Sequence, residues 1–296
     1  MTPGVTPRGH LTCPGAQLVK TQLQLLPLTA VLAFFFVGPI VIIFVVSFWD
    51  YTEFSLVPDF VLTNYLELFE SPVTYSIYLN TLKFAALSWF FTLVIGFAVA
   101  YFLAFHIRDL RWQIILFLVC TIPFWTSNII RMIAWIPVLG RNGLMNKALL
   151  NLGIVDAPVD WLLYSDFAVV LAFVHLYTLF MVVPIFNSMM RIDRSVLEAA
   201  RDGGASAWQT LLYVVIPLCR PGIAIGTIFV VSLVMGDFVT VQAMSGGQSA
   251  SVGVAMNHKR ALLQYPAAAA DAVILLVVVL VMVAMLMRTI NIRKEL

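Results

Sequence analysis

Residues 198–217 read EAARDGGASAWQTLLYVVIP, and this stretch decides the fold because it is the polar exception in an apolar chain. It carries charges, a Gly203-Gly204 pair and a terminal Pro217, while long apolar segments precede and follow it. A polar segment cannot cross hydrocarbon without satisfying its backbone and its charges. The stretch is therefore predicted to lie at a membrane surface, between two membrane-spanning segments.

Helix signals divide this stretch into two short helices. Ser195 and Glu198 have the spacing of a capping box, and so do Ser206 and Gln209. Between the two boxes the glycine pair supplies a left-handed stop, because glycine tolerates a positive φ. We expect one helix to begin near Ser195, and a second to run from Ser206 until Pro217 interrupts it.

Composition places the chain in the membrane. Of its 296 residues 61% are hydrophobic and 11% are charged, and the mean hydropathy is +0.98. A soluble domain is closer to about half apolar and about a quarter charged, so an all-α integral membrane protein is predicted. The net charge of +2, without a Lys/Arg cluster, argues against nucleic-acid binding. The three scattered cysteines and four isolated histidines have no metal-ligand spacing.

Six segments hold the roughly 20 apolar residues that a helix needs to cross a bilayer. The expected spans are 25–48, 79–105, 113–138, 166–190, 221–243 and 270–287. Residues 1–22 are interpreted as a polar tail, and residues 23–296 as one six-helix transmembrane domain. The segment 195–217 connects the fourth span to the fifth.

The distribution of Lys and Arg predicts the orientation. Eleven basic residues share one side of the membrane, namely Arg8, Lys20, Arg108, Arg111, Arg191, Arg194, Arg201, Arg220, Arg288, Arg293 and Lys294. The opposite side holds four, namely Arg141, Lys147, Lys259 and Arg260. Both termini and residues 195–217 are therefore expected in the cytoplasm. The first span lacks a small-residue cleavage site and is interpreted as retained.

Two interpretations of residues 195–217 are open. In the first the segment is a structured loop, and Glu198 does nothing beyond capping a helix. In the second it is a docking element, because its small side chains allow another protein to approach closely. Those small residues are Ala199, Ala200, Ala205 and Ala207. The docking hypothesis accounts for this face as well as for the helices.

The same residues resemble a cytoplasmic motif of ABC importer permeases, written E-A-A, three residues, Gly, nine residues, then I-x-L-P. The matching positions are Glu198, Ala199, Ala200, Gly204, Val214, Ile216 and Pro217. Val stands for the first Ile and Ile for Leu. Residues 123–146, 198–210 and 236–247 also resemble spermidine/putrescine-type permeases, and more narrowly the first of that system's two permease subunits. Relatives with this pattern are associated with opines and phosphonates as well.

The resemblance implies a type I ABC importer permease with six transmembrane helices and a cytoplasmic coupling helix, in a bacterial inner membrane. Its implied partners are two ABC ATPase subunits, a second and different permease chain, and an extracytoplasmic solute-binding protein. ATP and Mg²⁺ would be bound by the ATPase subunits. The implied solute is small and cationic or zwitterionic, with a polyamine first. Glu198 would fix the docked helix, Gly204 permit its turn, and Pro217 stiffen the junction to the fifth span.

The sequence carries no G-x-x-x-x-G-K-[ST] motif, so no nucleotide site and no enzymatic activity are expected of this chain. A secondary transporter or channel is the first rival, but residues 25–138 and 166–287 show no convincing repeat. An intramembrane enzyme is the second rival, and paired aspartates, zinc spacing and a G-x-S-x-G elbow are all missing from the sequence.

Polar residues within the apolar segments mark a candidate solute pathway, because intramembrane charges usually face a cavity or a partner. In the third span Thr121, Asn128, Arg131 and Trp135 recur at about helical spacing, with Trp125 near the same face. In the fifth span Asp237 follows Gly236. The candidate pathway residues are Trp125, Asn128, Arg131, Trp135 and Asp237.

The alternative for these residues is internal packing, in which Arg131 pairs with Asp237 and the tryptophans anchor the span at the membrane interface. Arg131 also repels a wholly cationic solute unless an acid neutralises it, so an amphoteric solute fits more easily. The Gly- and Asn-containing stretches 139–143 and 245–248 are predicted turns on the outer side. The resemblance implies that these loops help to receive the binding protein.

Overall fold

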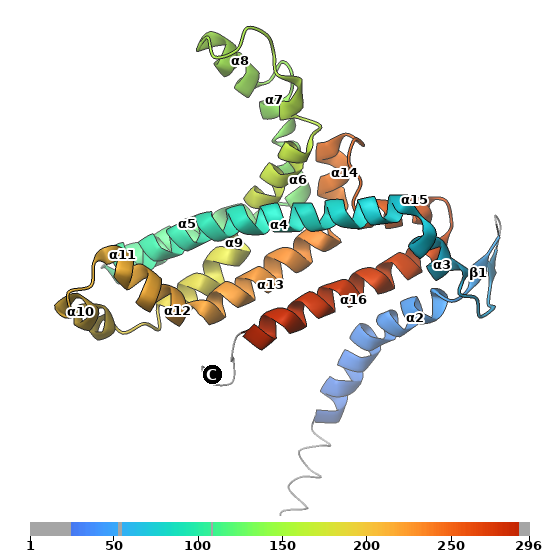
Figure 1. Cartoon of the computed structure of the whole chain (residues 1–296), viewed down its shortest axis with the longest axis horizontal. Coiled ribbons are helices and arrows are strands. Elements are labelled where there is room, and N and C mark those ends of the chain that lie inside the picture. Colours follow the sequence, from blue (N-terminus) through green and yellow to red (C-terminus); the bar gives the residue numbers. More distant parts are fainter. Residues whose placement is uncertain (1–24, 53–54, 108, 290–296) are drawn as a thin grey trace, which may run out of the picture.

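The computed structural model describes residues 25–52, 55–107 and 109–289, and it is almost entirely helical (Figure 1). The predicted polar tail 1–22 lies outside the described residues. The first apolar helix runs from Leu25 to Val46 and includes η1 (Ala33–Val37) and α2 (Gly38–Val46). It lies along α16 at the edge of the bundle, and no residue of its most apolar part is buried, as expected of a segment in contact with lipid or another subunit.

The chain then forms a small hairpin and the first long span. Strands β1 (Asp50–Tyr51) and β2 (Leu56–Val57) pair antiparallel, with Asp50 opposite Val57. The short helix α3 (Thr63–Glu70) leads into the span formed by α4 (Pro72–Tyr101) and η2 (Phe102–His106). The span therefore begins at Pro72, seven residues before the predicted start at 79, because proline is readily accommodated in the first turn of a helix.

The third predicted span is not one helix. In its place the chain forms α5 (Leu110–Thr121), η3 (Ile122–Trp125), α6 (Asn128–Ile133) and α7 (Ile136–Leu139), and α8 (Leu144–Asn151) follows beyond the predicted end at 138. The axis bends by 90° between Trp125 and Asn128, so that α6 lies beside α14 and α9 while α7 and α8 project beyond the bundle (Figure 1). Pro123 accounts for the break. Proline has no backbone N–H to donate to the carbonyl four residues earlier, and its ring clashes with that carbonyl.

The rest of the chain supplies two long helices and a second bent segment. The elements are η4 (Asp160–Leu162), α9 (Asp166–Met189), α10 (Arg194–Asp202), α11 (Ala207–Thr210), η5 (Leu211–Val215), α12 (Ile216–Leu218), α13 (Arg220–Gly236), α14 (Val239–Ser245), α15 (Val252–Ala261) and α16 (Tyr265–Thr289). Helix α13 ends at Gly236, so the fifth span does not extend to 243 as predicted. Among the described residues, four helices are long and apolar enough to cross a membrane. Two bent helix pairs, 110–151 and 207–236, bring the number of spans to the expected six when each pair counts as one span.

The core lies where α9 packs between α4 and α13, and the fully buried Phe173, Met181 and Ile185 line this side of α9. Glycines allow the close approach. A Cβ built on Gly96 of α4 would lie 2.9 Å from Met181 Cγ, and one on Gly226 of α13 would lie 2.6 Å from its Sδ. Small residues at helix crossings are the usual means of tight packing in membranes.

Candidate coupling site and solute pathway

The predicted docking element forms a compact pair of helices at one end of the bundle (Figure 1). We name residues 193–219, which include α10, α11, η5 and α12, the coupling wedge. Helix α10 begins at Arg194, and the Asp193 side chain caps it by accepting from the backbone N–H of Ser195, at 3.2 Å. The predicted capping box of Ser195 and Glu198 is therefore wrong. The N-cap residue is Asp193, two residues before Ser195, so Ser195 already lies inside the helix.

The end of α10 has the predicted glycine stop. Gly204 has a φ of +82°, and its N–H donates to the carbonyl of Arg201 at 2.9 Å. The N–H of Ala205 donates to the carbonyl of Ala200 at 3.0 Å. These two bonds are those of a Schellman motif, which satisfies the last carbonyls of a helix and reverses the chain. The backbone itself therefore needs glycine, or a residue that tolerates its conformation, at position 204.

The second capping box is confirmed. The N–H of Gln209 donates to Ser206 Oγ at 3.2 Å, and the N–H of Ser206 donates to Gln209 Oε1 at 2.8 Å. The helix continues through η5 and α12 to Leu218, one residue beyond Pro217. A bend of 67° then separates it from α13. Pro217 thus lies in the last turn, and the break itself falls at Cys219.

The wedge has an anchored base and an exposed tip. At the base Val215 and Cys219 are buried in the same core as Met189 at the end of α9. At the tip Glu198 and Ala199 are exposed, and so is Trp208, at 66%. No described residue forms a hydrogen bond or ion pair with the Glu198 carboxylate. Ile216 and Pro217 are half-buried at the junction, so the tip is available for contact while the base is held by packing.

The pathway candidates of the third segment do not form one helical stripe. Trp125 ends η3 before the bend and is 87% exposed, whereas Asn128 opens α6 after it. Arg131 is 8% exposed, and its Nη2 donates to Asn128 Oδ1 while its buried Nε has no partner among the described residues. The predicted common face of Thr121, Trp125 and Arg131 is therefore wrong, because the 90° bend separates them.

Helix α9 adds His175 and Thr178, which were not among the pathway candidates from the sequence. Trp135 Nε1 donates to His175 Nδ1 at 2.9 Å. His175 and Arg131 both line a cavity of about 180 Å³ that also reaches Cys120 and Thr178. The helix break thus turns Arg131 toward α9, where a buried guanidinium group and a histidine border the same space.

Asp237 lies directly after α13 and accepts three hydrogen bonds within the chain. Its Oδ2 accepts from the hydroxyl of Tyr177 at 2.7 Å and from Thr240 Oγ1 at 2.6 Å. Its Oδ1 accepts from the N–H of Thr240 at 3.0 Å, which caps the start of α14. The alternative pairing of Arg131 with Asp237 is not formed by these described side chains. Tyr177 and Thr240 were not found from sequence, because hydroxyl groups in apolar helices give no distinctive pattern.

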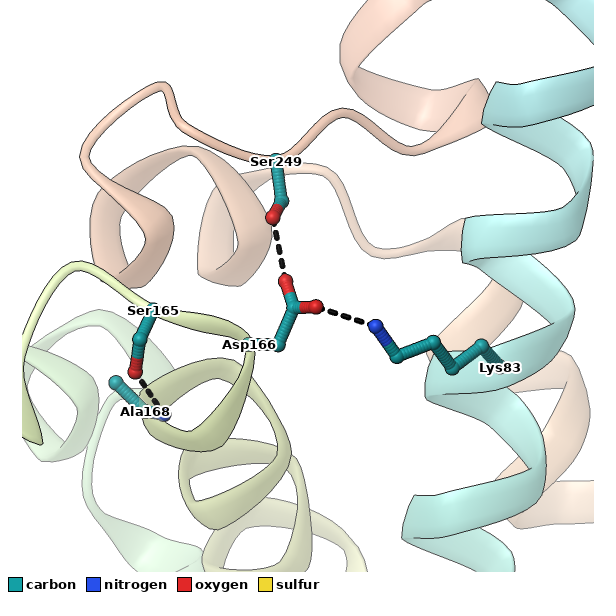
Figure 2. Close-up of polar contacts among 5 residues, drawn as sticks. All are labelled: Lys83, Ser165, Asp166, Ala168 and Ser249. Atoms are coloured by element: carbon teal, nitrogen blue, oxygen red, sulfur yellow. Dashed lines mark hydrogen bonds and ion pairs between the residues drawn. The ribbon is translucent and has the colours of Figure 1, made fainter. Parts of the chain in front are cut away.

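A polar network ties three elements together at the end of the bundle opposite the wedge (Figure 2). Asp166, at the start of α9, accepts from Lys83 of α4 and from the Ser249 hydroxyl in the loop after α14. Ser165 caps α9 by accepting from the N–H of Ala168 at 3.2 Å. The predicted turns are present nearby, since Gly246 and Gly247 both have positive φ and Gly143 N–H donates to the Gly140 carbonyl.

Broken apolar spans beside polar side chains, together with a protruding helical wedge, are the features of a helical membrane protein with several spans. Residues 88–294 match the family described as "Binding-protein-dependent transport system inner membrane component". This match covers well over half of the 296 residues, so the chain belongs to that family.

Curated relatives narrow the similarity further. The spermidine/putrescine transport system permease protein PotB of Salmonella typhimurium is 36% identical over 194 residues, which are 66% of this chain and 66% of that protein. The protein of the same name from Haemophilus influenzae is 33% identical over 224 residues, 75% of this chain and 77% of that protein. The aligned region thus spans about two thirds of the Salmonella relative.

Among solved structures, a bacterial ABC transporter involved in the import of the acidic polysaccharide alginate has a similar chain. The TM-score is 0.72, the identity is 17%, and the match covers 93% of this chain and 96% of the other. At this identity the likeness establishes the fold alone, which is that of a type I ABC importer permease.

Proposed function

We propose that this chain is the permease subunit of an ATP-driven, binding-protein-dependent importer, with the coupling wedge seated on a separate ABC ATPase subunit. The main support for this proposal is the structure of the wedge, a capped pair of helices with an exposed tip and a base buried in the core. A docked helix transmits its partner's motion when its base is stiff. Glu198, Ala199, Ala200 and Gly204 form the proposed contact region, and Ile216 and Pro217 form the proposed junction.

The proposed assembly contains two ATPase subunits that bind ATP and Mg²⁺, a second permease chain, and an extracytoplasmic solute-binding protein. Family membership supports a bacterial inner-membrane location. The distribution of Lys and Arg supports an orientation with both termini and the wedge in the cytoplasm. Family membership supports the partners, and the exposed first helix and the projecting helices α7 and α8 leave surface for a second permease chain.

The proposed solute is a polyamine of the spermidine/putrescine type, a choice supported by the names of the curated relatives. An amphoteric solute such as an opine is the second candidate, and one observation favours it. Arg131 is buried with a free Nε beside His175, whereas the carboxylate of Asp237 is already engaged three times. A solute carboxylate would match the guanidinium, whereas a second cation there would not.

Uptake into proteoliposomes tests both parts of this proposal. The chain is reconstituted with its partner subunits and the binding protein, and radiolabelled putrescine uptake is measured with and without ATP. ATP-dependent putrescine uptake is expected, and Gly204→Arg is expected to leave ATP hydrolysis while abolishing uptake. Uptake that survives ATP depletion but collapses with the proton gradient would contradict the importer. ATP-dependent uptake of an opine but not of putrescine would select the second candidate.

A further inference from the structure

An apolar groove of about 470 Å³ lies between α2 and α16, at the end of the bundle opposite the wedge. Both helices belong to membrane spans, and they lie side by side next to α15 in Figure 1. The two walls are formed by Ile42, Ile43 and Val46 of α2 and by Ala268, Ala269 and Ala272 of α16. None of the lining residues belongs to the candidate pathway. The volume falls in the range of about 300–1,000 Å³ typical of small-molecule sites.

One end of this groove carries an uncompensated positive charge. Arg260, at the end of α15, lines the groove and is exposed. Its Nε and Nη2 donate to Asn257 Oδ1 at 3.3 Å and 2.9 Å, and Asn257 Nδ2 donates to Gln242 Oε1 at 3.4 Å. These bonds hold the guanidinium group in place, but the amide that accepts from it is neutral. None of the described residues that line the groove is acidic, and no described carboxylate forms an ion pair with Arg260.

The charged end of the groove coincides with the ends of two membrane spans. Val46 is the last residue of α2 and Tyr265 is the first residue of α16, so the hydrocarbon region meets the lipid headgroups near this level. Tyr265 lines the groove and is exposed, and tyrosine is enriched at this boundary in membrane proteins. The groove therefore presents a positive charge at the level of the headgroups and an apolar surface at the level of the acyl chains.

We propose that this groove binds an anionic phospholipid, with one acyl chain between α2 and α16 and the phosphate on Arg260. A guanidinium group has five N–H donors in a planar arrangement that suits phosphate, and only two of its N–H-bearing nitrogen atoms donate within the described chain. A protein partner would have to bring a carboxylate to this level of the membrane, whereas a phospholipid always carries its phosphate there.

The lipid would hold the first helix against the bundle, because no residue of α2 is buried by the rest of the chain. It would cover only part of that helix. Phe34, Phe35 and Phe36 are exposed outside the groove and remain available to another subunit. The inference requires only that α2 and α16 lie in a membrane, so it does not depend on the proposed function.

Photo-crosslinking with a labelled lipid tests the site directly. The full-length chain, with its copurifying subunits, is placed in phosphatidylcholine nanodiscs that contain a trace of phosphatidylglycerol with a diazirine in one acyl chain. Irradiation and mass spectrometry give the adduct yield on residues 38–46 and 265–276, where adducts are expected to concentrate. Unlabelled phosphatidylglycerol should displace them at an at least about tenfold lower mole fraction than phosphatidylethanolamine, because the ammonium group of the latter offsets the charge of its phosphate.

Two matched pairs of variants control for specificity. Arg260→Gln is expected to lower the adduct yield at least about tenfold, whereas Arg141→Gln removes an exposed charge outside the groove and should leave the yield unchanged. Ala272→Phe fills the groove and should also lower the yield, whereas Ala284→Phe adds the same ring to an exposed position of α16 outside it and should not.

Three results would overturn the proposal. They are equal displacement by the two unlabelled lipids, equal adduct yields in the two arginine variants, and adducts spread evenly along the first helix. The absence of lipid adducts from both segments would also overturn it, in favour of a groove covered by protein.

Discussion

The contact between α9 and α13 at the base of the coupling wedge is predicted to be intolerant of a single added methyl group. A Cβ built on Gly222 would lie 2.5 Å from the carbonyl oxygen of Pro184 and 2.7 Å from Ser188 Cβ. Neither atom is the flexible end of a side chain, so the helices themselves would have to separate. This contact lies two residues after α13 begins, and it holds the two helices that flank the wedge.

The structure ranks three substitutions in α13. Overpacking a core lowers the unfolding free energy by about 1–3 kcal/mol, and a clash with backbone atoms falls at the upper end of that range. Alanine in place of glycine in a helix recovers about 1 kcal/mol, because its helix propensity is higher. Gly222→Ala should therefore lose about 2 kcal/mol of unfolding free energy. Gly226→Ala meets the Met181 sulfur at 2.6 Å, which is a flexible side-chain atom, and the Met181 Cα at 3.2 Å, a milder backbone overlap than at Gly222, so it should lose less. Gly236→Ala meets nothing within 4 Å and should be neutral or slightly stabilising.

Unfolding in mixed micelles of mild detergent and SDS measures these free energies, and uptake per ATP hydrolysed measures the coupling. The expected order of stability is Gly236→Ala, then Gly226→Ala, then Gly222→Ala. Gly222→Ala should also reduce uptake per ATP, because a loosened base transmits less of the partner's motion. A Gly222→Ala variant as stable and as well coupled as Gly236→Ala would refute the reasoning.

Three further predictions concern other parts of the molecule. Gly204→Asn should retain more uptake than Gly204→Val, because a left-handed conformation costs ordinary residues about 1–2 kcal/mol and asparagine adopts it more readily; equal activities would contradict this. Asn146→Leu removes the three hydrogen bonds by which the Asn146 side chain joins Gly140 and Val159 and holds together the segment between α7 and η4. The amide hydrogen-exchange rate of residues 140–160 should therefore rise at least about tenfold, and an unchanged rate would contradict this. Lys83→Met should cost at most about 1 kcal/mol, since both side chains of its ion pair with Asp166 are partly exposed to solvent. A loss above about 2 kcal/mol would contradict this and show that the network contributes more to stability than a surface ion pair.

Local signals in the sequence predicted the wedge well. The box of Ser206 and Gln209 and the positive φ of Gly204 were both correct, because caps and glycine stops depend on residues a few positions apart. One local error, at Ser195, arose where Asp193 offered a competing acceptor. The other was the end of the second helix, which passes Pro217 and stops at Leu218. Six apolar spans were also predictable, since span length is set by bilayer thickness.

The candidate pathway was harder to predict, because it depends on how the spans bend and pack. The spacing of Asn128, Arg131 and Trp135 indicated one continuous helix, but the segment breaks after Pro123. The partners of Asp237 and Trp135 are Tyr177 and His175, which lie on α9 and are 60 and 40 residues away in sequence. No periodicity within one span identifies a partner on another.

Photo-crosslinking from the wedge tests the central claim most directly. A photo-reactive benzoylphenylalanine replaces Trp208 at the exposed tip of the wedge. In a control it replaces Trp161, which lies shortly before α9 and is similarly exposed, at 61% against 66%. Membrane vesicles containing the full transporter are irradiated, and the adducts are identified by mass spectrometry. The account predicts an adduct between position 208 and a nucleotide-hydrolysing subunit, and none from position 161. Adducts of position 208 with extracytoplasmic proteins, or with no ATPase at all, would contradict it.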